Sequence, residues 1–405
     1  MSLLEVGVDR FLVEKLERRI QEVGRSVYLG SLSVSPVRWS TQWVEGATSP
    51  DYDDSAWQLV SEPYRWGGRR VRCSFRCRFE VPADWRGGSV ALRIELARGM
   101  HVSGPDGTVY LDGLAWQGVD VYHQEVRLPE RYQSGQHTLV VEAYSGTEPD
   151  SQEFGGVRLV LIDEQARGLY YDAKTALDAA LLLEETSYER VAILNALDEA
   201  ILQVDFREPL AAAYRASLPA ARRVLAERLY EREWGSERPE VIGTGHAHID
   251  VAWLWTLLHT RKKTGRTFLT ALRLMEQYPE YHFTQSQPQV YDFFRHDYPE
   301  WYAEVKRRIS EGRWEATGGM WLEADSNISG GESLVRQIMF GKRFFRREFG
   351  VEDKVLWLPD AFGYTWALPQ IMARSGLKYF MTTKISWSEY NRMPHDTFRW
   401  QGIDG

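Results

Sequence analysis

The spacing of the hydrophobic residues divides the chain into segments of different predicted structure. Over residues 8–23 they recur every three or four positions, as Phe11, Leu12, Leu16, Ile20 and Val23. This period is that of an amphipathic helix with one apolar face. We therefore predict an N-terminal helix, within a first segment of residues 1–27, that packs against a later part of the chain.

Residues 28–167 have the two-residue period of strands instead. Apolar side chains alternate there with polar or small ones, for example at Val90, Leu92, Ile94 and Leu96. Gly-Gly, Asp-Gly and Ser-Gly pairs separate such runs and are typical of turns. Short alternating strands joined by these turns predict an antiparallel β-sandwich.

A helical pattern returns over residues 168–238. Stretches rich in Ala, Leu and Glu predict two or three helices, at 175–183, 189–203 and 210–231. We interpret this segment as a connector between the sandwich and the last part of the chain.

From residue 239 to the end, strand-like and helix-like runs alternate. The predicted strands lie at 241–244, 281–286, 313–317, 354–359, 378–383 and 398–400. This alternation predicts a parallel, barrel-like α/β domain over residues 239–405, with functional groups at the carboxyl ends of its strands. Polar groups do follow these strands: His248 and Asp250, Gln285 and Gln287, Glu323 and Asp325, Asp360, and Lys384. The fold class is therefore multidomain.

The stretch from Val241 to Asp250 carries the first of these groups. An apolar start and two glycines precede His246, His248 and Asp250 in alternation, which indicates a buried strand that ends in reactive groups. Because every second side chain of a strand points to the same face, the three can converge on one point. Imidazole and carboxylate so close together favour half of a divalent-metal site, and a set of hydrogen-bonded polar caps is the alternative.

Asp360 follows a predicted strand, between Pro359 and a turn that contains Gly363. Its aromatic surroundings should raise the pKa of its carboxyl unless a cation compensates. A metal held by His248 and Asp250 would be that cation, and it would keep Asp360 ionised, as a nucleophile must be. The alternative is that Asp360 caps the following helix.

Composition narrows the function classes. The 405 residues suffice for two or three domains, and 43% hydrophobic with 26% charged residues is ordinary for a globular protein. A net charge of −8 disfavours nucleic acid as a partner. The 16 tryptophans and 20 tyrosines slightly favour a carbohydrate ligand, since aromatic rings stack on sugars.

The cysteines and the hydropathy of the chain indicate in which cellular compartment the protein is expected. Cys73 and Cys77 would lie about 13 Å apart along a strand, whereas a disulfide needs Cα atoms within roughly 7 Å. No oxidising compartment is implied. No apolar run approaches about 18 residues, and no hydrophobic signal region opens the chain, so we expect a cytoplasmic protein without a membrane partner. The sequence leaves the oligomeric state open, a homo-oligomer included.

Several motifs together resemble the glycoside hydrolase family 38 α-mannosidases. The first is Gly245-His-Ala-His-Ile-Asp-Val-Ala-Trp-Leu-Trp255. The resemblance continues in order through 288–293, 318–327, 331–337, 357–364, 368–370 and 398–405. Residues 50–57 resemble the jelly-roll, sugar-binding-like domains attached to many glycoside hydrolases. Such a sandwich and helices ahead of the motifs suit the bacterial and cytosolic branch of the family.

The resemblance implies roles for individual residues. His248 and Asp250 would be zinc ligands, and Asp360 both a third ligand and the nucleophile of a retaining mechanism. Trp253 would line the mannose pocket, Phe362 would form a wall beside it, and Lys384 would lie near the substrate. His246 would be a neighbour rather than a ligand. Glu323 and Asp325 would support the ligands or contact sugar, or would be solvated loop carboxylates.

The implied cofactor is a divalent metal, most naturally Zn²⁺, although cobalt or manganese could serve. The implied partner is a mannose-containing oligosaccharide or glycoside. The resemblance also implies a further histidine ligand and an aspartate general acid/base beyond Gly405. We therefore expect the chain to be the N-terminal portion of such an enzyme, with little or no activity alone.

Other interpretations remain open at this point. A His-x-His at a strand end also opens metal-dependent amidohydrolases, but the later histidines fall mostly in helical or loop contexts. A carbohydrate deacetylase would use a related scaffold, and a mannosylglycerate hydrolase shares the family's motifs. A non-catalytic carbohydrate-binding protein would explain the strand pattern of residues 28–164, but not the alternating strands and the polar strand ends after residue 239.

Overall fold

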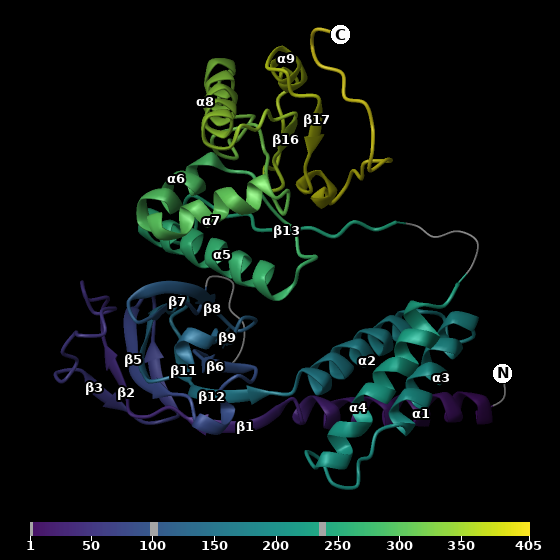
Figure 1. Ribbon diagram of the computed structural model, residues 1–405. Coiled ribbons are helices and arrows are strands. Elements are labelled where there is room, and N and C mark those ends of the chain that lie inside the picture. The colour runs from purple at the N-terminus through teal and green to yellow at the C-terminus, as the bar shows by residue number, and fades with distance from the viewer. Residues whose placement is uncertain (1–2, 98–103, 235–239) are drawn as a thin grey trace.

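The computed structural model describes residues 3–97, 104–234 and 240–405. Within them lie an antiparallel β region, a group of helices and an α/β region, as the sequence predicts (Figure 1). The predicted segment boundaries at 27, 167 and 238 stay predictions. Over the described ranges, the helices are too short or too polar to span a bilayer.

The predicted sandwich is present as two antiparallel sheets that share a core. One sheet has the order β1-β12-β6-β9 and the other β3-β2-β5-β10-β7-β8, while β4 pairs with β11. Phe75, Leu92, Ile94 and Val141 are fully buried between the sheets. The strands are β1 Tyr28–Ser33, β2 Val37–Ser40, β3 Gln58–Val60, β4 Tyr64–Gly67, β5 Arg72–Glu80, β6 Val90–Glu95, β7 Asp106–Leu111, β8 Leu114–Val119, β9 Glu125–Arg127, β10 Gln136–Tyr144, β11 Ser151–Phe154 and β12 Gly156–Ile162.

Both cysteines lie on β5 as free, buried thiols, which confirms that they form no disulfide. Burial raises the pKa of Cys73 and of Cys77 to about 12. The two thiols are therefore inert members of the sandwich core.

The N-terminal helix packs with the connector helices. These are α1 Leu3–Arg25, α2 Glu164–Leu182, α3 Tyr188–Leu202 and α4 Ala212–Leu225, which continues as the π-helical η3 Ala226–Tyr230. Leu16, Leu169, Leu197 and Leu218 meet in one core. The helix predicted at 175–183 begins too late. In the structure Asp163 caps α2 by accepting hydrogen bonds from the backbone N–H of Gln165 and Ala166, so the helix begins directly after it.

The last region contains the predicted parallel strands and intervening helices. The strands are β13 Gly245–His246, β14 Phe283–Gln285, β15 Trp314–Ala316, β16 Val355–Trp357 and β17 Tyr379–Met381. The helices are α5 Leu257–Gln277, α6 Pro288–Asp297, α7 Pro299–Ser310, α8 Gly331–Phe349, α9 Leu368–Arg374 and the 3₁₀-helical η4 Lys384–Trp387. The strands pair as β13-β14-β15 and β16-β17. No closed barrel forms within the described residues, so the barrel-like part of the prediction is not confirmed.

Gly318 joins the two parallel sheets, because it forms a parallel bridge with Leu356. Its φ is +132°, and a Cβ there would lie only 2.2 Å from the carbonyl oxygen of Ser286. The close approach requires glycine. It brings the loops after β13 and β16 to the same edge.

Two predicted strands are wrong. Residues 241–244 form no strand, and Val241 and Ile242 are 88% and 84% exposed, because only Gly245 and His246 find a pairing partner in β14. Residues 398–400 also form none. Trp400 packs its ring on Phe380 at 5.2 Å instead of pairing its backbone.

Helix α5 lies against β7 and β8 of the sandwich (Figure 1). The backbone N–H of Gly118 donates to Thr270 Oγ1 at 3.1 Å. Asp106 on β7 pairs with Arg266 Nη2 at 2.8 Å, and Glu142 on β10 pairs with Lys262 Nζ at 2.7 Å. The sandwich and the α/β region therefore share a charged, largely buried interface.

His259 in this interface makes stability depend on pH. Burial lowers its pKa to about 4, and the neighbouring Asp106 only partly offsets that effect. In the unfolded chain its pKa is about 6.5, so the unfolded state takes up the proton first as the pH falls. Between about pH 6.5 and 4 the folded state should lose up to about 3 kcal/mol from this group.

Denaturant titrations across that pH range test this prediction. His259→Gln should flatten the fall in unfolding free energy, whereas the exposed His282→Gln should leave the slope of wild type. Parallel curves for wild type and His259→Gln would contradict the assignment.

Candidate metal centre

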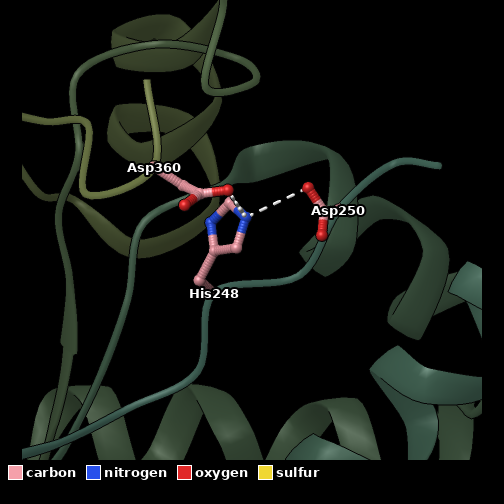
Figure 2. A group of neighbouring side chains, drawn as sticks. All are labelled: His248, Asp250 and Asp360. Carbon is pink, nitrogen blue, oxygen red and sulfur yellow. Dashed lines mark hydrogen bonds and ion pairs between the residues drawn. The ribbon is translucent and has the colours of Figure 1, made fainter. Parts of the chain in front are cut away.

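Three predicted side chains converge on one point (Figure 2). His248 Nε2 lies 3.2 Å from Asp250 Oδ1 and 3.3 Å from Asp360 Oδ2. One donor atom of each residue lies within 4.8 Å of those of the other two. His248 and Asp250 come from the loop after β13, and Asp360 from the loop after β16. Residues far apart in sequence thus meet because their parallel strands end at the same edge.

Two buried glutamines hold the backbone of the first loop. Gln285 Nε2 donates to the carbonyl of Ala247, and Gln287 Nε2 donates to that of Ile249, both at 3.0 Å. The sequence predicts these two glutamines only as polar groups at a strand end. In the structure they brace the backbone on either side of His248 and are not members of the group in Figure 2.

Glu323 supports the imidazole of His248 from the other side. Its Oε2 lies 2.8 Å from His248 Nδ1, and its side chain is only 7% exposed. Its other oxygen accepts from Ser286 Oγ at 3.1 Å and from Gln287 Nε2 at 3.3 Å. A carboxylate at one ring nitrogen leaves the other free for a metal, which is the common arrangement around metal-binding histidines.

The charged groups around His248 carry an excess of negative charge. Burial lowers the pKa of His248, but Glu323 and Asp250 outweigh burial and raise it to about 9. Asp360 adds a third carboxylate, and Lys384 Nζ pairs with Asp360 Oδ1 at 2.7 Å. So many carboxylates around one imidazole attract a further cation.

The donor set fits a zinc-like ion. Zinc takes histidine nitrogen and carboxylate oxygen at about 2.0–2.2 Å, so two ligands of a tetrahedral ion lie roughly 3.4 Å apart. The separations of 3.2 and 3.3 Å at His248 Nε2 match that spacing. His248, Asp250 and Asp360 could therefore hold the metal, with three protein ligands as in catalytic sites.

His246 lies outside the group. Its Nε2 accepts a hydrogen bond from Trp357 Nε1 at 3.1 Å. Burial and the neighbouring His248 lower its pKa to about 4, so it is a neutral acceptor. The expected convergence of His246 with His248 and Asp250 is therefore wrong, because the strand ends at His246 and residues 247–250 lie in a loop where strand alternation no longer holds. The role of a neighbour, which the resemblance implies, stays a prediction.

Aromatic side chains stand beside Asp360. Lys384 Nζ lies 5.0 Å from the ring centre of Phe362 and 3.5 Å from that of Trp387. Phe362 and Trp387 are each 68% exposed, which leaves ring surface available to a ligand. The sequence prediction missed Trp387, and only its place three residues after Lys384 could have indicated it.

Two predicted residues lie apart from these contacts. Trp253 is 58% exposed and meets the edge of Trp255 at 5.7 Å. Asp325 is exposed and accepts from the backbone N–H of Asn327 and Ile328, so it is a loop-capping carboxylate.

Comparisons with known proteins agree with the motifs. Residues 238–405 match the family model described as the glycosyl hydrolases family 38 N-terminal domain. Alpha-mannosidase G of Dictyostelium discoideum is 28% identical over 418 residues, which cover 98% of this chain and 37% of that protein.

Two further relatives carry similar names. The alpha-mannosidase of Saccharomyces cerevisiae is 38% identical over 270 residues, covering 64% of this chain and 24% of that protein. Human alpha-mannosidase 2C1 is 32% identical over 352 residues, covering 82% of this chain and 32% of that protein. The part of this chain that aligns thus spans between 24% and 37% of the length of these three relatives.

Glu323→Gln tests the support of His248. We expect divalent-metal affinity to fall about 10- to 100-fold, because the neutral amide balances less charge on the ring and orients it less firmly. Competition with a chromophoric chelator measures the affinity. Asp325→Asn, in the same loop but exposed, is the control and should bind like wild type. Equal affinities for both variants would remove Glu323 from the account.

Proposed function

We propose that this chain, whose residues 238–405 belong to the N-terminal domain of the family 38 glycosyl hydrolases, serves a metal-dependent hydrolase of terminal α-mannosides. The convergence of His248, Asp250 and Asp360 carries the proposal, because it brings the separated motifs together at one point. The names of the relatives supply the substrate class, a mannose-containing oligosaccharide or glycoside.

In this proposal His248, Asp250 and Asp360 hold the metal, with Zn²⁺ favoured and Co²⁺ as an alternative. The ion would supply positive charge between the carboxylates and a binding point for sugar hydroxyls. Glu323 keeps the His248 ring in orientation. His246 stays out of the ligand set, which weakens the amidohydrolase alternative, since that site needs further histidines.

Asp360 is the proposed nucleophile. Lys384 holds its Oδ1 through the ion pair of 2.7 Å, and this contact fixes the carboxylate in the loop after β16. One Asp360 oxygen attacks the anomeric carbon, the bond to the leaving oxygen breaks, and water later releases the sugar from the ester. The leaving oxygen takes up a proton from a general acid as its bond to the anomeric carbon breaks, and the water that later attacks the ester gives one back to the same group. No residue of the described ranges is assigned that role.

Phe362 and Trp387 are proposed to form walls around the sugar, and Trp253, which lies apart from them, is proposed as a further wall on the strength of the resemblance alone. Their exposed rings can pack on the apolar faces of a pyranose, and Lys384 beside two of them can donate to a hydroxyl. The two free thiols are compatible with the predicted cytoplasmic location, which stays a prediction.

Asp360→Asn in the full-length natural protein tests the nucleophile. Hydrolysis of 4-nitrophenyl α-mannoside should fall on the order of 10³-fold or more, as for other covalent nucleophiles. Circular dichroism should show an unchanged fold, and the exposed Asp396→Asn should keep full activity. Retention of half the wild-type rate by Asp360→Asn would sink the proposal.

The stereochemistry gives a separate test. A covalent intermediate on Asp360 predicts that α-mannose is the first product, because two displacements restore the original configuration. Proton NMR during the first minutes of hydrolysis distinguishes the anomers before they equilibrate. The appearance of β-mannose first would exclude Asp360 as a nucleophile and indicate a single displacement by water.

A further inference from the structure

We propose that Asp106, in the β-sandwich, is a positioning residue for the metal centre in the α/β region. Asp106 holds helix α5 through Arg266 and Lys263, and the first turns of α5 hold the backbone of Asp250. The inference rests on the proposed function to the extent that Asp250 is a metal ligand. It adds a task for the sandwich that does not require the sandwich to bind sugar.

The first link is the contact between β7 and α5. Asp106 is 7% exposed, and its Oδ2 lies 2.8 Å from Arg266 Nη2 and 3.3 Å from Lys263 Nζ. His259 Nε2 is 3.7 Å from Oδ1 of the same carboxylate. Charges paired away from water interact strongly, and removal of one partner leaves the others uncompensated. Asp106 thus fixes the first three turns of α5 on the sandwich.

The second link runs from α5 to the metal loop. Thr260 Oγ1 donates to the carbonyl of Asp250 at 3.1 Å, and Trp255 Nε1 donates to the same oxygen at 3.2 Å. Trp255 Nε1 also lies 3.2 Å from Thr260 Oγ1. These three groups form a closed hydrogen-bonded cluster, so the position of Asp250 follows that of the helix.

Lys263 connects the two links directly. Its Nζ pairs with Asp106 and lies 4.6 Å from the ring centre of Trp255, within range of a cation–π contact. One path therefore has three contacts, from Asp106 to Lys263, from Lys263 to Trp255, and from Trp255 to Asp250. A second path runs from Asp106 through the helix α5 that it holds to Thr260, and from Thr260 to the same Asp250 carbonyl. A site built from three side chains tolerates little displacement of any one of them.

The interface offers a matched control. Glu142 on β10 pairs with Lys262 Nζ at 2.7 Å in the same contact between sandwich and α5. Glu142 also accepts from Tyr110, a sandwich residue. The contacts of Lys262 are with the sandwich rather than with Trp255. Loss of the Glu142 pair should weaken the interface without releasing the metal loop.

The experiment measures Zn²⁺ affinity of the full-length natural protein by competition with a chromophoric chelator. Asp106→Asn should weaken binding about 10-fold or more, within the range for residues that orient metal ligands. Glu142→Gln should bind within about 2-fold of wild type. Where Asp106→Asn fails to fold, Lys263→Met replaces it, since this variant keeps the pair between Asp106 and Arg266.

A double-mutant cycle tests whether the effect follows the path. Thr260→Val removes the hydroxyl from the Asp250 carbonyl without touching Asp106. If both residues act through Asp250, the loss in the double variant should be smaller than the product of the single losses. Multiplicative losses would overturn the path.

Hydrogen exchange of the metal-free protein gives a readout that needs no metal. Peptides covering residues 247–256 should exchange faster in Asp106→Asn than in wild type, and at the wild-type rate in Glu142→Gln. Equal exchange in Asp106→Asn and wild type would contradict positioning.

The outcomes separate this inference from the proposed function. If wild type binds no zinc, or His248→Ala binds it as well as wild type, the metal centre itself is wrong and the inference falls with it. If His248→Ala abolishes binding while Asp106→Asn matches wild type, only the positioning role is overturned. If Glu142→Gln weakens binding as much as Asp106→Asn, the effect is general loosening of the interface, which also overturns the role.

Discussion

The gathering of carboxylates around one imidazole is the constraint on which the site depends. Asp250, Asp360 and Glu323 all contact His248, and among the residues that the structure describes only Lys384 pairs a further positive charge with Asp360. Like charges at such distances repel, and partial burial strengthens the repulsion. A divalent cation at His248 Nε2 and the two aspartates relieves it, which is the physical reason to place a metal there.

The fold supplies the framework that holds this arrangement. Parallel strands bring the loops after β13 and β16 to one edge, and Gly318 allows the two sheets to join. Buried Gln285 and Gln287 fix the first loop. The sandwich holds α5 through buried ion pairs, and α5 in turn contacts the Asp250 backbone. The N-terminal half is thus physically connected to the site rather than merely adjacent to it.

Much of this organisation follows from local sequence patterns. Hydrophobic periods predict the sandwich, the helices and most parallel strands, because each element must bury one face. The positions of His248, Asp250 and Asp360 after two predicted strands predict their convergence, whereas the alternation that also included His246 was wrong, because the strand ends at His246. The exposed Val241 and Ile242 were misjudged because an apolar run forms a strand only where a neighbour can pair with it.

Long-range contacts lie beyond such patterns. The sequence offers the same possible roles for Glu323 and Asp325. Only the difference in burial makes Glu323 a partner of His248 and Asp325 a loop cap. The pair between Asp106 and Lys263 joins residues 157 positions apart. Neither the hydrophobic pattern nor the residue spacing of the sequence indicates this ion pair. Its energetic importance comes from the exclusion of water at an interface between two regions.

The location of the metal is the central claim, and anomalous X-ray diffraction at the zinc edge tests it most directly. Crystals of the zinc-loaded protein should show one strong peak about 2.0–2.2 Å from His248 Nε2 and from an oxygen of both Asp250 and Asp360. The peak should disappear in His248→Ala. A zinc peak elsewhere, with His248 still paired to Asp250 and Asp360 as in Figure 2, would contradict the account.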